Sequence, residues 1–215
     1  MISIYFLSAE KIKECNFDSL VCSLPFGESE RIRLNLIKNP THKRESLGGL
    51  TALWELSEIL GLPLPVNVAR AASGKPYFEN SARAFGISHS CGICAAAIAD
   101  SAHTEIGFDI ELINEKYDCV QISDRFFTPE EKLRFELCEK STEAFFSIWT
   151  AKEARAKLDG KGLGALISSK ESSGDAPVYI SQLTVSIQEK RVAVAVCSYF
   201  SDEPIQIYFD RSLKQ

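Results

Sequence analysis

The order in which strand and helix patterns follow one another limits the fold of this chain most. Helical periodicity predicts helices at 41–60, 129–139 and 142–158. Alternating or short apolar runs predict strands at 2–7, 76–79, 84–88, 92–99, 105–113, 178–187, 191–198 and 204–209. Because strands and helices do not alternate regularly, we expect an α+β fold rather than a parallel doubly wound sheet, with two halves, residues 1–103 and 104–215.

Residues 105–113 predict a strand with one acidic face. Side chains alternate along a strand, so Phe108 and Ile110 point one way while Asp109 and Glu111 point the other way, about 7 Å apart. Two like charges at that spacing need a cation or solvent, and oxygen ligands suit Mg²⁺ better than Zn²⁺. A half-buried strand with a solvated acidic face would give the same alternation.

The predicted helix 142–158 carries aromatic and charged residues on one face. Phe146, Trp149, Glu153 and Lys157 follow at spacings of three, four and four residues. Large aromatic side chains usually face a core, where a carboxylate is costly unless it is paired or bound to metal. Glu153 is therefore a third candidate metal ligand, although a surface Glu–Lys pair remains the alternative.

Two short segments offer groups that can contact phosphate. Lys75 lies between Gly74 and Pro76, which restrict the backbone of the turn on both sides. Ser88-His89-Ser90 ends a predicted strand with two hydroxyls and an imidazole. A Ser/His/Asp triad is disfavoured there, because adjacent strand residues face opposite ways and no Gly-x-Ser-x-Gly turn is present.

Net charge and cysteine content limit the expected partners and cellular location of the protein. A net charge of −5 does not favour a nucleic-acid partner, and no apolar run approaches a membrane span. The N-terminal residues do not resemble a signal peptide, so we expect a cytoplasmic protein with reduced cysteines. Cys91 and Cys94 have the CxxC spacing but lack a second pair, which favours core cysteines over a zinc or redox site.

Taken in order, these segments resemble the Sfp-type 4'-phosphopantetheinyl transferases. The matching motifs are Gly74-Lys75-Pro76, Ile87-Ser88-His89-Ser90, Gly107-Phe108-Asp109-Ile110-Glu111, Arg125-Phe126-Phe127, Trp149-Thr150-Ala151-Lys152-Glu153-Ala154, Lys157 and Gly160-Lys161-Gly162-Leu163. The most specific part is the acidic strand combined with the helix that carries Trp149, Glu153 and Lys157. Two positions depart from the family pattern: Gly86 stands where Asn is frequent, and Phe108 stands where Ile or Val is common.

The resemblance implies two pseudo-symmetric α+β halves with coenzyme A in the cleft between them. It implies Mg²⁺ as the metal, and it assigns the metal-binding carboxylates to Asp109, Glu111 and Glu153. The residues that it places against coenzyme A phosphates are Arg44, Lys75, Ser88, His89 and Lys157, with Arg31 and Arg33 as further candidates. Lys157 would stabilise charge on the reacting phosphate and would be oriented by Glu153. Glu153, Glu111 or a metal-bound water would accept a proton.

The implied activity is that of a holo-[acyl-carrier-protein] synthase type of 4'-phosphopantetheinyl transferase. Such an enzyme moves the arm of coenzyme A to a serine of an acyl or peptidyl carrier protein and releases 3',5'-ADP. We expect a monomer whose carrier-binding face includes the predicted helices with Lys132, Arg134 and Lys152. The alternatives are a non-catalytic, regulatory relative that binds coenzyme A or a carrier protein, a Mg²⁺-dependent phosphohydrolase, and a plain interaction domain.

Overall fold

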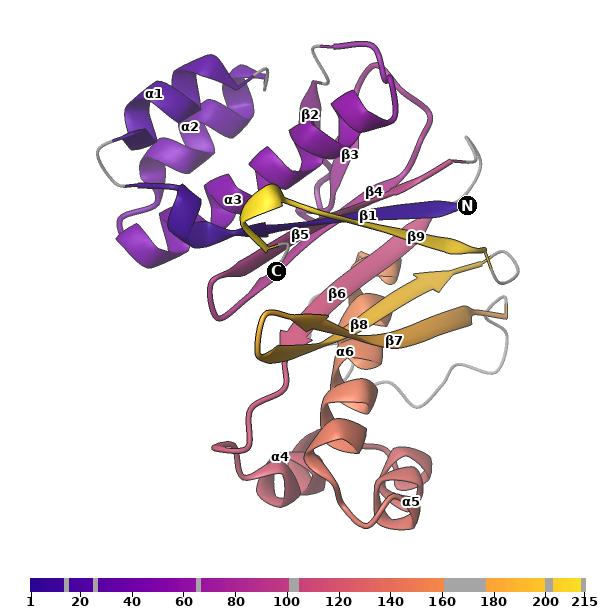
Figure 1. Ribbon diagram of the computed structural model, residues 1–215. Coiled ribbons are helices and arrows are strands. Elements are labelled where there is room, and N and C mark those ends of the chain that lie inside the picture. Colours follow the sequence, from indigo (N-terminus) through magenta and orange to yellow (C-terminus); the bar gives the residue numbers. More distant parts are fainter. Residues whose placement is uncertain are drawn as a thin grey trace.

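In the computed structural model of Figure 1, the described residues form two main sheets, mostly antiparallel, with covering helices and a short two-stranded sheet. The structure describes residues 1–13, 16–24, 27–64, 67–100, 105–160, 177–199 and 203–213. The expected α+β class is confirmed. None of the helices in these parts of the chain is both long and apolar enough to cross a membrane.

The first sheet contains both ends of the described chain. Its strand order is β4 (Phe85–Ser90), β5 (Ile93–Ala99), β1 (Ile2–Ser8) and β9 (Ile205–Phe209). Only the β1–β9 pair is parallel. Around this sheet lie η1 (Ala9–Lys11), α1 (Phe17–Ser23), α2 (Glu28–Leu36), α3 (Pro40–Ile59), β2 (Val68–Arg70), β3 (Pro76–Phe78) and η3 (Arg211–Leu213).

The second sheet is built from the later part of the chain. Its strand order is β6 (Ile106–Leu112), β8 (Lys190–Ser198) and β7 (Tyr179–Ile187), all antiparallel, and β7–β8 is the expected hairpin. The helix α6 (Thr142–Asp159) lies along this sheet. The shorter helices α4 (Cys119–Phe126) and α5 (Pro129–Leu137) lie near the N-terminal end of α6 (Figure 1).

The two sheets share a core, which gives the molecule a layered arrangement. One face of the first sheet packs against α3, through residues such as Tyr5 and Leu53. Its other face contributes Ile4 to a core that includes Phe108 and Val194 of the second sheet. The outer face of the second sheet is covered by α6, because Ala154 and Leu158 of the helix share a buried cluster with Ala195 and Cys197 of β8.

The boundary at residues 103 and 104 lies outside the described residues and stays a prediction. The first sheet nevertheless takes a strand from each side of it, because β9 pairs with β1 from Ile2↔Ile205 to Phe6↔Phe209. The first sheet is therefore not built from the first half alone. Local patterns cannot reveal such a pairing, since it depends on contacts between the two ends of the chain.

Local signals set the ends of the long helices. Ser141 caps α6 by accepting a hydrogen bond from the Ala144 amide, and Gly160 ends it with a φ of 64°. Thr128 and Glu131 form the capping box that starts α5. The short elements α1, α2, α4 and β2 were outside the sequence-based expectations, because they are too short to show clear periodicity.

The two cysteines of the CxxC segment differ in their surroundings. Cys94 is buried in β5, as expected, and its thiol contacts the backbone oxygen of Glu45 at 3.5 Å. The expectation of a core position is wrong for Cys91, which is exposed in the turn between β4 and β5 with a φ of 46°. Both thiols are free.

Candidate metal and phosphate site

Three carboxylates meet where β6 faces α6. Asp109 and Glu111 come from β6 and Glu153 from α6, and one oxygen of each lies within 4.8 Å of the others. Asp109 is only 1% exposed, whereas Glu111 and Glu153 are partly buried. These three residues, called here the carboxylate cluster, are the set that the sequence indicated.

Gly107 explains how the helix comes so close to the acidic strand. A β-carbon at this position would overlap the carbonyl oxygen of Ala154 and lie 2.6 Å from the amide nitrogen of Leu158. Any larger residue would push α6 away from β6, and Glu153 would move with it. The glycine at the start of this strand is therefore part of the geometry of the cluster.

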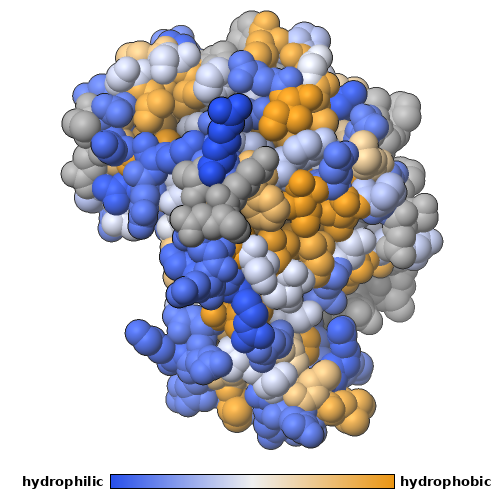
Figure 2. Space-filling model, in the orientation of Figure 1, coloured by the Kyte–Doolittle hydropathy of each residue, from blue (hydrophilic) through white to orange (hydrophobic). Residues whose placement is uncertain are grey.

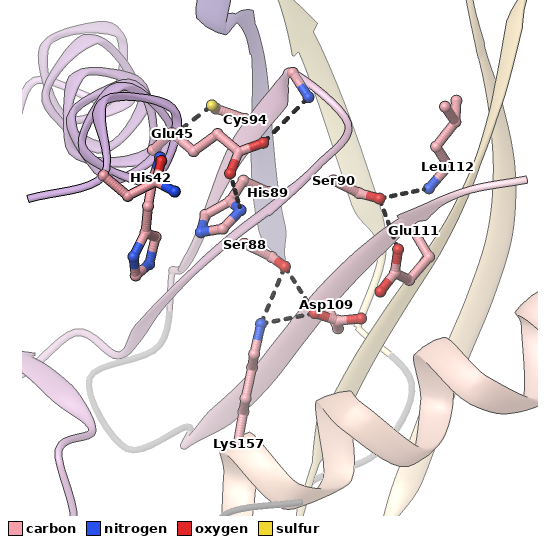
Figure 3. Close-up of polar contacts among 12 residues, drawn as sticks. His42, Glu45, Ser88, His89, Ser90, Cys94, Asp109, Glu111, Leu112 and Lys157 are labelled. Carbon is pink, nitrogen blue, oxygen red and sulfur yellow. Dashed lines mark hydrogen bonds and ion pairs between the residues drawn. The ribbon is translucent and has the colours of Figure 1, made fainter.

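Asp109 has one satisfied and one unsatisfied oxygen. Oδ1 accepts hydrogen bonds from Ser88 Oγ at 2.7 Å and from Lys157 Nζ at 2.6 Å, and the three side chains converge in Figure 3. Oδ2 is buried and has no hydrogen-bond partner among the described residues. A buried, unpaired carboxylate oxygen is costly, and a bound cation would remove that cost.

Burial makes the other two carboxyl groups of the cluster easier to protonate than an exposed glutamate. Burial raises the pKa of Glu111, while a hydrogen bond from Ser90 Oγ at 2.6 Å opposes the rise. Burial, followed by repulsion from Asp109 and Glu111, raises the pKa of Glu153 to about 7, against the opposing charge of Lys157. A hard divalent cation fits this donor set, because it would neutralise charges that the protein alone leaves in conflict.

A cavity of about 370 Å³ opens beside the cluster, between the two halves. Its walls come from α2, α3, β2, β4, β6, the turn before β3 and the end of α6. The side chains in its lining that can carry positive charge are Arg33, His42, Arg70, Lys75, His89 and Lys157. Such a lining suits a ligand with several phosphate groups.

Lys75 is fixed at the C-terminal end of α6. Its Nζ donates to the carbonyl oxygen of Leu158 at 2.9 Å and lies 3.6 Å from the carboxylate of Glu105. The negative end of the helix dipole favours a cation at this place. Lys75 therefore reaches from the first half to the helix that carries Glu153 and Lys157.

His89 is held against the first long helix. Its Nδ1 lies 3.4 Å from Glu45 Oε2, and Glu45 Oε1 accepts from the Gly92 amide at 3.3 Å (Figure 3). Burial lowers the pKa of His89, Lys157 and His42 lower it further, and Glu45 opposes them. His89 thus lines the cavity while its Nδ1 is held near Glu45.

The structure places the remaining predicted residues differently. Arg44 lies on α3 outside the lining of the cavity, and Ser88 faces Asp109. Among the described residues, Lys157 Nζ bonds Asp109 and Ser88, the latter with Nζ–Oγ at 3.0 Å, whereas Glu153, which was expected to orient it, interacts with it through charge alone. Lys161, Gly162 and Leu163 lie outside the described residues.

Sequence reasoning missed Arg70, which enters the cavity beside Arg33. Both arginines pair with Glu30, which is 1% exposed, and Arg33 Nε lies 2.9 Å from its Oε2. Arg70 Nη1 also donates to the carbonyl oxygen of Gly74 at 3.0 Å, next to Lys75. No local motif marks Arg70, since its partners lie on another element.

Comparison with known proteins places this chain among its relatives. The family model described as the 4'-phosphopantetheinyl transferase superfamily matches residues 105–197. The 4'-phosphopantetheinyl transferase of Bacillus subtilis is 30% identical over 156 residues, which cover 71% of this chain and 67% of that protein. The transferase AcpT of Salmonella typhimurium is 32% identical over 139 residues, covering 63% of this chain and 68% of that protein.

A Synechocystis protein provisionally named a 4'-phosphopantetheinyl transferase is 34% identical over 107 residues, covering 47% of this chain and 43% of that protein. The resemblance drawn from the motifs is thus confirmed, and the residues that the family model matches include the acidic strand and the helix with Glu153. This chain belongs to the 4'-phosphopantetheinyl transferase superfamily.

Proposed function

We propose that this protein transfers the 4'-phosphopantetheine arm of coenzyme A to a serine of an acyl or peptidyl carrier protein. The serine oxygen forms a bond to the phosphorus that carries the pantetheine arm, the bond from that phosphorus to the leaving oxygen breaks, and 3',5'-ADP departs. The observation that carries the proposal is Lys157, which lines a cavity with other cationic side chains and also bonds Asp109 of the carboxylate cluster at 2.6 Å. A protein with this arrangement can hold a charged diphosphate at one place and fix its orientation.

The residues of the cluster fit Mg²⁺ as the metal of this reaction. Asp109, Glu111 and Glu153 would hold it, and the unpaired Oδ2 of Asp109 is the atom that most needs a cation. When bound, Mg²⁺ supplies neutralisation of charge on the diphosphate. The dependence on this metal is part of the proposal.

The side chains of the protein itself supply the remaining contributions. Lys157, at the edge of the cavity, stabilises negative charge on the phosphate, while Lys75 and His89 hold the ligand from the first half. The serine proton passes to a base at the cluster, for which Glu153, Glu111 and a water held by the cluster are the candidates by position.

The surface beyond the end of the second sheet offers a place for the carrier protein. Leu133 and Leu137 are exposed on the same face of α5, and Figure 2 shows apolar residues beside hydrophilic ones in this lower region. Arg134 and Arg125 are exposed nearby and suit an acidic partner. Lys152 is unsuited to this role, since its side chain is 9% exposed and pairs with Glu131 at 2.8 Å.

The deciding experiment is mass spectrometry of an apo acyl carrier protein after incubation with this protein, coenzyme A and Mg²⁺. A mass gain of one phosphopantetheine arm, absent with EDTA and with Asp109→Ala, is the expected result. Binding of coenzyme A with no mass gain on either acyl or peptidyl carrier proteins would instead identify a regulatory relative. A monomeric state and a cytoplasmic location belong to the same proposal, and size-exclusion chromatography with light scattering tests the first of these.

A further inference from the structure

Strands β4 and β6 lie beside each other where the two sheets meet. Each is the edge strand of its own sheet, and hydroxyl groups of β4 contact carboxylates of β6. Ser88 Oγ lies 2.7 Å from Asp109 Oδ1, and Ser90 Oγ lies 2.6 Å from Glu111 Oε2, with the same separation of 21 residues in both contacts. The two strands therefore run in the same direction with a constant register. Each of the two serines of β4 contacts one carboxylate of β6.

The hydroxyl of Ser90 both donates and accepts a hydrogen bond. Its oxygen accepts a hydrogen bond from the backbone amide of Leu112 at 3.0 Å, as Figure 3 shows. An amide N–H can only donate, so the proton of the hydroxyl is directed to the carboxylate of Glu111. Ser90 thus links the side chain of Glu111 to the backbone of the next residue in the same strand.

The position of Ser90 is itself restricted. The residue is buried, and it is the last residue of β4 before a two-residue turn in which Cys91 and Gly92 have φ values of 46° and 82°. Positive φ at both central residues is the tight hairpin turn that matches the twist of antiparallel strands. The amide of Gly92 donates to Glu45 of α3 at 3.3 Å, which attaches this turn to that helix.

We infer that Ser90 is a positioning residue, which fixes the carboxylate of Glu111 within the cluster and thereby sets the affinity of the cluster for a divalent cation. The inference rests on the proposed function only in taking the cluster as a cation site. Hydrogen bonds to ligating carboxylates hold them in the orientation that a metal requires, and their loss typically weakens binding by about 10- to 100-fold.

The test measures Mn²⁺ binding to the whole protein by electron paramagnetic resonance of the free ion, with Mg²⁺ as competitor. Ser90→Ala should raise the Kd for Mn²⁺ by at least about tenfold, and Ser90→Thr, which keeps the hydroxyl, should restore most of the affinity. Ser57→Ala is the matched control, since the hydroxyl of Ser57 is fully buried and donates to Leu53 O at 2.8 Å in α3. This control should lose similar stability but keep the Kd of the unaltered protein.

An unchanged Kd in folded Ser90→Ala would overturn the inference, as would the absence of Mn²⁺ binding by the unaltered protein. If Ser90→Ala does not fold, as judged by circular dichroism, Ser90→Cys replaces it, because the thiol is close in size but a weaker donor. The expected Kd is then intermediate, and an unchanged value again contradicts the role. Mn²⁺ binding that depends on Ser90, together with no transfer to any carrier protein, would reject the proposed function but retain this inference.

Discussion

Lys157 Nζ lies 2.6 Å from Asp109 Oδ1, and the same oxygen accepts the hydroxyl of Ser88 at 2.7 Å. One carboxylate oxygen therefore connects α6, β6 and β4, which belong to both halves of the molecule. Lys157 neutralises this oxygen while Oδ2 is left without a partner among the described residues. A cation at Oδ2 and a phosphate at Lys157 would thus bind to neighbouring parts of one polar network.

Replacing Lys157 by alanine should reduce turnover far more than the binding of coenzyme A. Removal of one hydrogen-bond donor that stabilises charge in the transition state typically lowers kcat by about 100- to 1,000-fold. We expect the Kd for coenzyme A, measured by calorimetry, to change by less than about tenfold, because Arg33, Arg70 and Lys75 remain in the cavity. Lys157→Arg, which keeps the charge, is the comparison variant, and a kcat of Lys157→Ala equal to that of the unaltered enzyme would remove this residue from the reaction.

Replacing Asp109 by asparagine should abolish metal binding and leave the fold intact. The amide is nearly the same size as the carboxylate, and its removal of one negative charge relieves the repulsion that acts on Glu153. Calorimetry with Mg²⁺ and circular dichroism measure the two effects. Asp124→Asn is the control, because Asp124 lies at the surface near Lys132. Equal Mg²⁺ binding by Asp109→Asn and the unaltered protein would contradict the metal site.

The stability of the metal-free protein should fall as pH rises through about 7. The pKa of Glu153 is about 7 in the folded protein and 4.5 for the unperturbed group, so the folded state binds the proton more tightly than the unfolded state. This contribution is complete below the unfolded value and is lost as pH passes the folded value, a difference of ~2 kcal/mol between about pH 5.5 and pH 8. Urea unfolding of the unaltered protein and of Glu153→Gln measures it.

The effect of Mg²⁺ on stability should run in the opposite direction. Binding requires the ionised carboxylates, so Mg²⁺ should raise the free energy of unfolding more at pH 8 than at pH 5.5 and should release protons when it binds. Glu153→Gln should lose most of this pH dependence. A metal effect that is independent of pH would show that Glu153 does not carry the proton in the metal-free cluster.

Replacing Gly86 by alanine should weaken both stability and metal binding. A β-carbon at position 86 would lie 2.6 Å from the β-carbon of Phe108, so β4 would have to move away from β6. Such overpacking costs about 1–3 kcal/mol. The same movement would lengthen the contacts of Ser88 and Ser90 with the cluster, which chemical denaturation and Mn²⁺ binding would both reveal. Unchanged values of both would show that the strands adapt without cost.

Replacing Glu45 by glutamine should lower the pKa of His89 further. The pKa is already lowered by burial, and Glu45 is the first group that opposes this lowering. Loss of its charge makes the imidazolium less stable, so a smaller fraction of His89 is charged at a given pH. NMR titration of the ring would show the shift, and Glu58→Gln, at the surface of the same helix, should leave the titration unchanged.

Part of the carboxylate cluster could be predicted from local sequence. The alternation of Phe108, Asp109, Ile110 and Glu111 in a strand requires the two carboxylates to share a face, and helix spacing puts Glu153 and Lys157 on another shared face. These relations follow from backbone geometry, so the sequence was sufficient to define them. The family motifs then indicated that the two faces meet.

Other features depended on contacts between distant segments. The pairing of β9 with β1, the convergence of Arg33 and Arg70 on Glu30, and the burial of Lys152 against Glu131 have no local signature. The contact between Ser90 and Glu111 also has no local signature, because it depends on two edge strands from different sheets lying side by side.

The sequence by itself determined the α+β class, the ends of the long helices and the identity of the three carboxylates, because periodicity and capping act over a few residues. Only the tertiary structure decided which oxygen of Asp109 is left unpaired, what orients Lys157, and which arginines enter the cavity. Those properties depend on burial and on partners brought from other elements by packing, and a linear pattern does not specify them.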